Sequence, residues 1–252
     1  MTPDERQAAI LVRARASGRV EVAALSEVFA VTPETIRHDL AALEDQGLLR
    51  RVRGGAIVVD LFGFEPTAGN RADCRLPESR MARAALEHLP SQGWVFLDAE
   101  IPTARLAELI PADVELGVVT NSLPIAALLA SRPGISLHLV GGVVRGRTLA
   151  TVECPLLPYP SAIGIDVAFL TATAISVEDG VTTQDRAAAT IKRAAVAAAR
   201  STVVLAEHTA FGPARFAHVA RLSEIDVVIT DVGLPLETAR RVEASGPELV
   251  RT

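Results

Sequence analysis

A run of polar side chains near the amino terminus has the types and spacing that suit nucleic-acid recognition. Thr32 and Pro33 form a helix-start signal, a hydroxyl N-cap followed by proline at the first helical position. Ile36, Leu40 and Leu43 then repeat at the spacing of one apolar helical face. The polar side chains around them point the other way and can reach base edges or phosphates: Thr32, Glu34, Thr35, Arg37 and His38.

A basic hairpin is predicted directly after this helix. Residues 48–58 read as two short strands around a Gly54-Gly55 turn, and Arg50, Arg51 and Arg53 lie on them within reach of phosphate. A helical hairpin used for protein contact is the alternative interpretation. Turn, N-cap, basic helix face and arginine-rich wing occur together, so the favoured interpretation is a winged helix-turn-helix that binds double-stranded DNA.

Two further helices must position the recognition helix. Thr2 to Ala16 places Ile10, Leu11 and Ala14 on one face, and a short link, Arg19 to Glu21, follows it. The next helix shows Leu25, Val28 and Phe29 at helical spacing, and Gly47 supplies the stop of the recognition helix. We expect residues 1–58 to form this domain and residues 59–76, which contain glycines and prolines with little periodicity, to form a linker.

Residues 77–252 show a different pattern, in which apolar runs alternate with helix-like stretches. The runs are Trp94–Leu97, Leu116–Val119, Leu137–Val140, Val167–Leu170, Val203–Ala206 and Val227–Ile229, and the stretches between them include Thr103–Ile110, Leu123–Ala130 and Ala187–Ala199. Such alternation predicts an α/β domain with a doubly wound, largely parallel sheet.

Polar residues and glycines follow several of these strands, where an open parallel sheet gathers its ligands. Asn, Ser and Gly are also ordinary turn formers, so several turns on one edge carry more weight than any single turn. The effector-binding candidates are Asp98, Glu100, Thr103, Thr120, Asn121, Ser122, Gly141, Gly142, Arg145, Arg147, Thr171, Lys192, Glu207, His208 and Thr209.

The amino-terminal motif resembles a known family. The string from Val31 to Leu40, followed by Leu43-Glu44, Gly47-Leu48, Arg51 and Gly54 to Ala56, is similar to the signature of DeoR-type repressors. His38 departs from it, because the family usually has a second arginine there, and a histidine contact would depend on pH.

The resemblance covers nearly the whole chain and is closest to actinobacterial fructose-operon repressors. Further similar stretches are Val119 to Ser122, Gly141-Gly142 with Arg145, Asp166 to Phe169, Gly180 to Thr183 and Ile229 to Asp231. The resemblance implies a sensor domain with a fold like that of sugar-phosphate isomerases, which binds a phosphorylated sugar such as fructose 1-phosphate. It also implies a repressor of a sugar-metabolism operon.

Three loops depart from the family pattern. Glu100 replaces a glycine and Pro102 removes an N–H donor, Ala210 replaces a lysine, and the loop from Phe169 to Ala174 loses both of its usual glycines. A phosphate dianion about 4 Å from Glu100 would be repelled by about 2 kcal/mol even in bulk water. The hypothesis is that fructose 1-phosphate binds weakly or not at all, and that the ligand is neutral, less phosphorylated or cationic. The alternative is that Arg145, Arg147 or Lys192 holds the phosphate instead.

Composition narrows the class of protein. A chain of 252 residues with 49% hydrophobic and 22% charged residues predicts two globular domains. No apolar run is long enough for a membrane span and no signal peptide is evident, so a cytoplasmic location without membrane contact is expected. Cys74 and Cys154 lack metal or redox spacing, and His88, His138 and His218 have no partner spacing, so no metal and no cofactor are expected.

Three functions remain open at this point. The first is a ligand-controlled repressor that binds operator half-sites as a symmetric homodimer or homotetramer. The second is an isomerase-like enzyme using Asp98, Glu100 or Glu207 as acid or base, which the missing lysine disfavours. The third is a constitutive DNA-binding protein with a vestigial pocket. The first is preferred, and the chain is predicted not to be an enzyme.

Overall fold

The computed structural model describes residues 2–17, 19–45, 49–58, 77–146, 148–153 and 164–252. The chain divides into two units, Met1–Cys74 and Arg75–Thr252. The predicted linker at 59–76, the helix stop at Gly47, Arg147 and both cysteines lie outside the described residues. The expected boundaries at residues 58 and 77 therefore stay a prediction.

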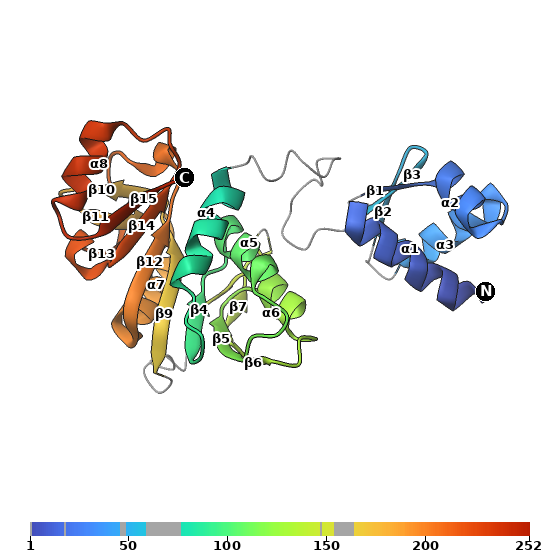
Figure 1. The fold of residues 1–252 in the computed structure, drawn as a ribbon, viewed down its shortest axis with the longest axis horizontal. Coiled ribbons are helices and arrows are strands. Elements are labelled where there is room, and N and C mark those ends of the chain that lie inside the picture. Colours follow the sequence, from blue (N-terminus) through green and yellow to red (C-terminus); the bar gives the residue numbers. More distant parts are fainter. Residues whose placement is uncertain (1, 18, 46–48, 59–76, 147, 154–163) are drawn as a thin grey trace. The chain divides into compact units, whose positions relative to one another are not determined.

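The amino-terminal unit is a helix-turn-helix with a small sheet (Figure 1). Its elements are α1 (Pro3–Ser17), β1 (Arg19–Glu21), α2 (Val22–Phe29), α3 (Pro33–Asp45), β2 (Leu49–Val52) and β3 (Gly55–Val58). The strands form an antiparallel sheet in the order β1-β3-β2. The predicted link at 19–21 is thus the third strand of the wing. The turn lies at Arg53-Gly54, where Gly54 has φ +84°, because Gly55 already pairs with Val52.

The predicted apolar faces of α1 and α3 form the core of this unit. Its buried side chains are Ile10, Ala14, Val20, Leu25, Ile36, Leu40, Leu43, Leu49 and Ala56. The placement of Val28 on the apolar face of α2 is wrong, because its side chain is 51% exposed. The eight-residue α2 buries Leu25 fully and only partly buries Phe29, so the face that it turns to the core is narrow.

The second unit contains a seven-stranded sheet. Its strands are β4 (Trp94–Leu97), β5 (Leu116–Thr120), β6 (Ile135–Leu139), β9 (Ile165–Thr171), β12 (Ala199–Leu205), β14 (Val227–Thr230) and β15 (Glu248–Arg251). Their order is β15-β14-β12-β9-β4-β5-β6, and every neighbouring pair is parallel. The predicted parallel sheet is confirmed, with β15 as an edge strand that the apolar runs did not indicate.

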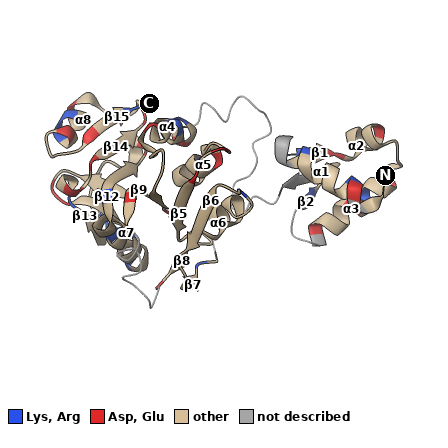
Figure 2. Cartoon of the chain, turned by 60° about the horizontal axis from the view of Figure 1, so that its bottom comes forward, with Lys and Arg blue, Asp and Glu red and all other residues tan. Residues whose placement is uncertain are grey.

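Helices cover both faces of this sheet, as a doubly wound fold requires. They are α4 (Pro77–Ala85), α5 (Ile101–Leu109), α6 (Leu123–Leu129), α7 (Arg186–Ala198) and α8 (Leu236–Glu243). Figure 2 shows α4 and α5 on one side of the sheet and α7 on the other. Among the helices of the described residues, none is both long and apolar enough to cross a membrane.

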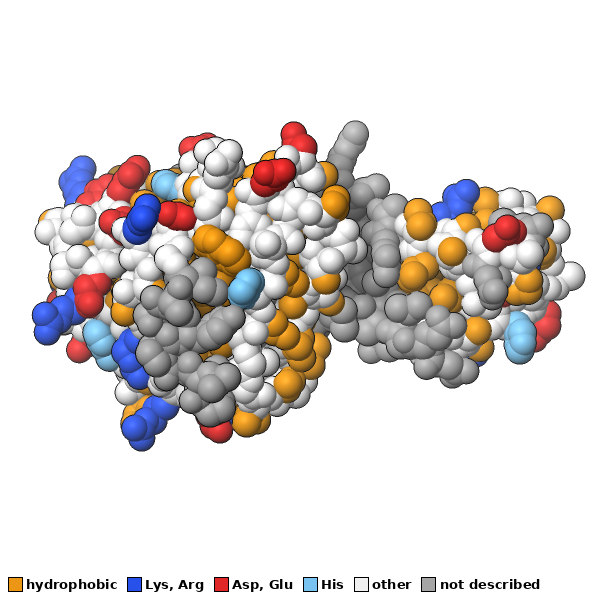
Figure 3. Space-filling view, turned by 90° about the horizontal axis from the view of Figure 1, so that it is seen from below, with side chains coloured by type: hydrophobic (Ala, Val, Ile, Leu, Met, Phe, Trp, Pro, Cys, Tyr) orange, Lys and Arg blue, Asp and Glu red, His pale blue; other side chains and the backbone are white. Residues whose placement is uncertain are grey.

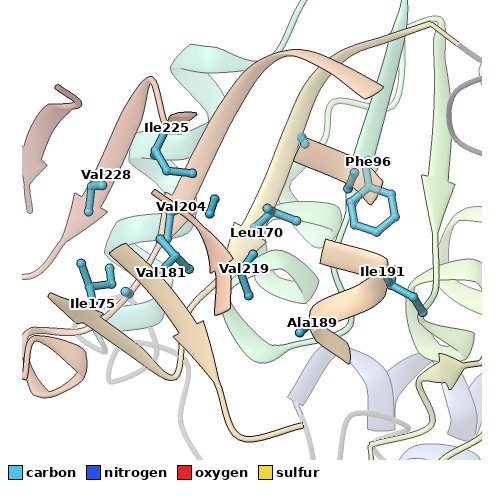
Figure 4. Close-up of a cluster of buried hydrophobic side chains, with 14 of the residues drawn as sticks. Phe96, Leu170, Ile175, Val181, Ala189, Ile191, Val204, Val219, Ile225 and Val228 are labelled. Atoms are coloured by element: carbon cyan, nitrogen blue, oxygen red, sulfur yellow. The ribbon is translucent and has the colours of Figure 1, made fainter. Parts of the chain in front are cut away.

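An additional antiparallel sheet lies beside α7. It contains β10 (Ala174–Ser176), β11 (Gly180–Thr183) and β13 (Ala217–Ala220), and a separate pair joins β7 (Val143–Val144) to β8 (Thr151–Val152). Side chains from the large sheet, the small sheet and α7 meet in one core, as Phe96, Leu170, Val181, Val219 and Ile191 show in Figure 4. This core holds the carboxyl ends of β9 and β12 in place.

The strand order defines the place where a ligand would bind. From β4 the chain proceeds through β5 and β6 on one side and later through β9, β12, β14 and β15 on the other. The carboxyl ends of β4 and β9 therefore form a topological switch point, where loops diverge and leave a crevice.

Candidate functional site

The outer face of α3 carries the residues predicted to recognise DNA. The backbone N–H of Thr35 donates to Thr32 Oγ1 at 3.2 Å, so Thr32 caps the helix as predicted. Glu34, Arg37 and His38 are exposed, and Thr35 is half-buried. Figure 3 shows acidic, basic and histidine side chains at the surface of this unit.

Two arginines of this surface are paired with glutamates. Arg37 donates to Glu34 at 2.7 Å, and Arg51 of β2 donates to Glu44 at 2.5 Å through its Nε and at 2.8 Å through its backbone N–H. The backbone N–H of Arg51 and then its guanidinium lower the pKa of Glu44. Both acidic and basic residues are visible on α3 in Figure 2. Arg53 is exposed at the wing turn, and the Arg50 side chain lies outside the described atoms.

A buried ion pair holds α3 against α1. Arg6 donates to both carboxylate oxygens of Asp39, at 2.5 Å from Nε and 3.1 Å from an η nitrogen, and Gln7 Nε2 donates to Asp39 Oδ1 at 3.3 Å. Sequence reasoning missed this pair. The available signal was that Asp39 shares the inner face of α3 with Ile36 and Leu43, where an unpaired carboxylate would be costly.

A pocket of about 260 Å³ opens at the switch point of the large sheet. Its walls come from the loops after β4, β9 and β12 and from the start of α4. The lining residues are Glu78, Glu100, Ile101, Pro102, Thr171, Ala172, Thr173, Leu205, Ala206, Glu207, Thr209 and Ala210. Of the predicted effector residues, the structure brings Glu100, Thr171, Glu207 and Thr209 together here. Glu78 was missed, because nothing in the sequence indicates that the first turn of α4 reaches these strand ends.

Asp98 and Lys192 form a buried ion pair beside the pocket. Lys192 Nζ donates to Asp98 Oδ2, to Thr171 O at 2.8 Å and to Thr171 Oγ1 at 2.9 Å. Asp98 also accepts from the Thr171 N–H at 3.2 Å and the Thr171 hydroxyl at 2.8 Å. Neither Asp98 nor Lys192 lines the pocket. Lys192 is thus neutralised within the protein, which differs from the prediction that it faces an effector.

Most of the remaining candidates hold the strand ends in place. Thr103 Oγ1 donates to Asp98 O at 2.6 Å, and Thr120 Oγ1 donates to Leu97 O at 2.7 Å. Ser122 caps α6 by accepting from the Ile125 N–H at 3.3 Å. These hydroxyls form hydrogen bonds with backbone groups, which accounts for their positions directly after strands.

The loops after β5 and β6 contain the other candidates. Asn121 Nδ2 donates to Thr151 O at 3.2 Å, and its buried Oδ1 has no hydrogen-bond partner among the described residues. Gly141 and Gly142 are exposed, and Gly142 has φ +137°. Arg145 pairs with Asp185, the N-cap residue of α7, at 3.4 Å. None of these residues lines the pocket.

The pocket is acidic. Its lining includes Glu78, Glu100 and Glu207 and no lysine, arginine or histidine among the described residues. Burial, the charge of Glu78 and a hydrogen bond with Glu78 raise the pKa of Glu207, and Asp231 adds to this, while His208 opposes it. Glu78 and Glu207 therefore lie close enough at the pocket wall for the charge of Glu78 to disfavour ionisation of Glu207.

His208 lies behind Glu207 and is held by Asp231. Its Nδ1 and its backbone N–H each lie 2.7 Å from an Asp231 oxygen, and the Gly233 N–H donates to Asp231 at 2.8 Å. Burial alone would raise the pKa of Asp231, but the hydrogen bonds from His208 and Gly233 lower it. His208 therefore positions the loop after β12 and does not line the pocket.

Both units match known families. Residues 6–61 match the DeoR-like helix-turn-helix domain, and residues 78–232 match the DeoR C terminal sensor domain. The chain is 34% identical over 251 residues to the HTH-type transcriptional regulator GlpR of Haloferax volcanii, covering 99% of this chain and 98% of the relative. It is 27% identical to the glycerol-3-phosphate regulon repressor of Escherichia coli strain K12, covering 94% of each chain.

Among solved structures, the full-length sorbitol operon regulator SorC from Klebsiella pneumoniae aligns with a TM-score of 0.43 and 13% identity, covering 88% of this chain and 94% of that chain. At this TM-score no detail of that structure transfers to the present protein. The two domain matches and the full-length relative decide the assignment. The chain therefore belongs to the DeoR-type family of DNA-binding transcriptional regulators and is not an enzyme.

Proposed function

We propose that this regulator represses a carbohydrate-metabolism operon by binding operator half-sites as a homodimer or homotetramer, and that a small-molecule effector in the strand-end pocket changes its affinity for DNA. The observation that carries the DNA-binding part is the exposed face of α3 next to the wing. The relatives support the choice of operon, since they include the glycerol-3-phosphate regulon repressor and a putative aga operon repressor of Escherichia coli O157:H7.

In this proposal α3 enters the major groove. Thr35 and His38 face base edges, and Arg37 exchanges Glu34 for a guanine or a phosphate. Arg51 and Arg53 of the wing hold the sugar-phosphate backbone, which fixes the register of α3 without reading sequence. In the free protein Glu34 holds Arg37 and Glu44 holds Arg51. Each of these two ion pairs must open when DNA binds.

Protection of DNA from the chain's own upstream region tests this part. Arg37→Ala is expected to lower affinity and relax the sequence preference, because a bidentate base contact contributes about 1–3 kcal/mol. Arg53→Ala should weaken binding to all sequences alike and lower the slope of log affinity against log salt by about 0.9. Arg240→Ala, an exposed arginine of α8, is the matched control. Unchanged protection in both test variants would contradict the proposal.

The effector part rests on the pocket at the switch point. Open α/β sheets bind ligands there, and closure of the loops after β4, β9 and β12 around a ligand would favour one conformation of the unit over another. The acidic lining does not favour a phosphate dianion, so an effector without a free phosphate is proposed. In a melting experiment, saturation at about 100 times Kd should stabilise the protein by about 2.7 kcal/mol.

A further inference from the structure

We propose that the sensor unit carries a second DNA-binding surface, a basic face beside the small sheet that holds the phosphate backbone of duplex DNA next to the operator half-sites. The basic face is defined by five exposed side chains: Arg186 and Arg193 of α7, Arg200 of β12, Arg215 in the loop before β13, and His218 of β13. The proposal goes beyond the function proposed above, which assigns DNA contacts to α3 and the wing alone.

The elements that carry the basic face lie side by side. The last residue of β11 pairs with the first residue of β13, and α7 begins three residues after β11 ends. The start of α7 and the loop before β13 therefore lie at the same end of the small sheet, which places Arg186 and Arg215 there. Further along, Arg193 donates to the carbonyl oxygen of His218 at 2.5 Å. Arg186 and Arg193 are seven residues apart, so they share one side of α7 and lie about 10 Å apart along its axis.

The central arginines of this face carry uncompensated charge. Among the described residues, Arg186, Arg193 and Arg215 have no carboxylate partner. The remaining hydrogen bond of the Arg193 guanidinium goes to Thr190 Oγ1 at 3.1 Å, which is a neutral acceptor. Three exposed cations are thus available to an anion from outside the chain.

The carboxylates at the border of the face do not cancel this charge. Asp166 pairs with Arg200 at 3.3 Å, and Asp185 pairs with Arg145 at 3.4 Å. Each of these two acids is matched by one arginine, so the three central arginines remain in excess.

The face differs from an ordinary solvated helix surface, which mixes charges of both signs. On α3, α5 and α8, the arginines Arg37, Arg105 and Arg241 pair with glutamates. In contrast, α7 carries three basic residues and no acidic residue (Figure 2). The whole chain has 30 acidic and only 25 basic residues, so its composition does not account for an all-basic helix.

Helix stability does not account for the face either. Arg186 is the first residue of α7, where the positive end of the helix dipole disfavours a cation. A phosphate near Arg186 would be attracted both by the guanidinium and by that end of the dipole. An external anion therefore gives this residue a role that folding does not.

Duplex DNA is the anion that the rest of the molecule brings close. The 18 residues from 59 to 76 can span at most about 65 Å, which corresponds to about 19 base pairs of duplex. A basic helix face is also the usual electrostatic footprint of phosphate binding. A second copy of the chain is a poorer partner, because each described helix with two or more acidic residues also carries arginine.

Anisotropy titrations of the full-length protein with two operator duplexes test the basic face. One duplex ends at the half-sites, and the other is extended by about 20 base pairs on each side to match the reach of the chain. The wild type is expected to bind the long duplex more tightly and with a steeper slope of log affinity against log salt.

The test variant is Arg186→Gln combined with Arg193→Gln. On the long duplex it should lower the salt slope by up to about 1.8, since each lost phosphate contact contributes about 0.9, and it should weaken the long duplex more than the short one. The sequence preference should not change. Arg240→Gln with Arg241→Gln on α8 removes the same charge and should behave as the wild type. Equal losses on the two duplexes, or none on either, would overturn the proposal.

A further variant distinguishes DNA from a protein partner. Phe216 is 77% exposed and follows Arg215 directly. A phosphate contact does not need this apolar side chain, so Phe216→Ala should keep the salt slope of the wild type. If Phe216→Ala or the double glutamine variant changes the sedimentation coefficient of the protein without DNA, the face is a contact between copies and the proposal fails.

Non-operator duplex of the same length separates this proposal from the proposed function. The basic face reads no sequence, so the double glutamine variant should lose salt slope on this DNA as well. If the wild type protects no operator but this loss is observed, the operator proposal fails and the basic face stands. If the operator is protected but the variant equals the wild type on every duplex, the basic face is wrong and the operator proposal stands.

Discussion

Single charged residues have two kinds of role in this protein. On the helix-turn-helix unit, Arg37 and Arg51 are exposed and paired with Glu34 and Glu44. In the proposed complex, the glutamates would compete with DNA for these guanidinium groups. In the interior of the same unit, Asp39 is 3% exposed and is paired with Arg6. The exposed pairs can open in the proposed complex, whereas the buried pair between Arg6 and Asp39 fixes the position of α3.

The exposed pairs lead to a prediction about Glu44. Glu44→Gln should raise the affinity for DNA by about threefold or more, because it removes a negative charge near the phosphates and frees Arg51 for one of them. The slope of log affinity against log salt should become steeper by up to about 0.9. Binding to non-operator DNA, measured by anisotropy, should rise as well. Glu27→Gln on the exposed side of α2 serves as the control, and a loss of affinity in Glu44→Gln would show that Glu44 positions Arg51 instead.

The buried pair leads to a prediction about stability. Asp39→Asn leaves the Arg6 guanidinium buried without a counter-charge, and removal of one partner of a buried pair is costly. The melting temperature of the amino-terminal unit should fall by at least about 5 °C, as judged from the usual scaling for a domain of this size. Glu34→Gln, which breaks only an exposed pair, should leave it nearly unchanged. Equal melting temperatures for both variants would contradict the assigned role of Asp39.

At the scale of elements, the pocket is made by loops that the large sheet brings together. The loops after β4, β9 and β12 belong to adjacent strands in the order β12-β9-β4, and α4 adds Glu78. Thr103 ties the start of α5 to the end of β4, and the hydrogen bonds from Thr171 to Asp98 join the ends of β4 and β9, so the bases of these two loops are fixed. In the proposed effector site, the side chains at a few loop positions would therefore set which ligand charge is favoured.

Because the bases of these loops are fixed, side chains on them can be exchanged in a gain-of-function test. Glu100→Gly combined with Ala210→Lys removes one carboxylate from the wall and adds a cation to it, which makes both loops similar to the family pattern. A charge-assisted contact contributes about 1.5–3 kcal/mol, so the double variant should bind fructose 1-phosphate at least about tenfold more tightly than the wild type. Calorimetry checks this. If wild type and variant bind fructose 1-phosphate equally well, the phosphate is held elsewhere and the pocket interpretation fails.

At the scale of the whole molecule, the carboxyl pair makes stability depend on pH. The folded-state pKa of Glu207 is raised, so its contribution to stability is fully present below its unfolded pKa and is lost as pH rises through the raised value. The close approach of Glu78 and Glu207 therefore lowers the stability of the ligand-free protein at neutral pH. It persists in the structure next to a cavity, as binding sites commonly hold groups that are not optimal for stability.

Melting temperatures measured across a range of pH test this loss of stability. Without ligand, Glu207→Gln should raise the melting temperature of the sensor unit at neutral pH by about 2 °C or more, and should flatten its fall with rising pH. Asp231→Asn should act oppositely, because the pKa of Asp231 is lowered and its stabilisation is present above the unfolded pKa and lost as pH falls through the folded value. A pH profile of Glu207→Gln identical to that of the wild type would rule out the raised pKa.

The sequence alone determined the helix-turn-helix, six of the seven strands of the parallel sheet and the outward face of α3. Helical periodicity at Ile36, Leu40 and Leu43 and the Thr32-Pro33 start signal are local patterns, and alternating apolar runs indicate a parallel sheet without knowledge of contacts. The departures at Glu100 and Ala210 were also readable, since they are changes of residue type within recognisable loops.

Only the tertiary structure decided which charges meet. Glu78 reaches Glu207 across 129 residues of sequence, Lys192 is neutralised by Asp98, and Arg6 is buried against Asp39. No local pattern encodes these pairs, because the interaction of two charges depends on their separation and burial in space and not on their spacing along the chain. The acidity of the pocket follows from that packing.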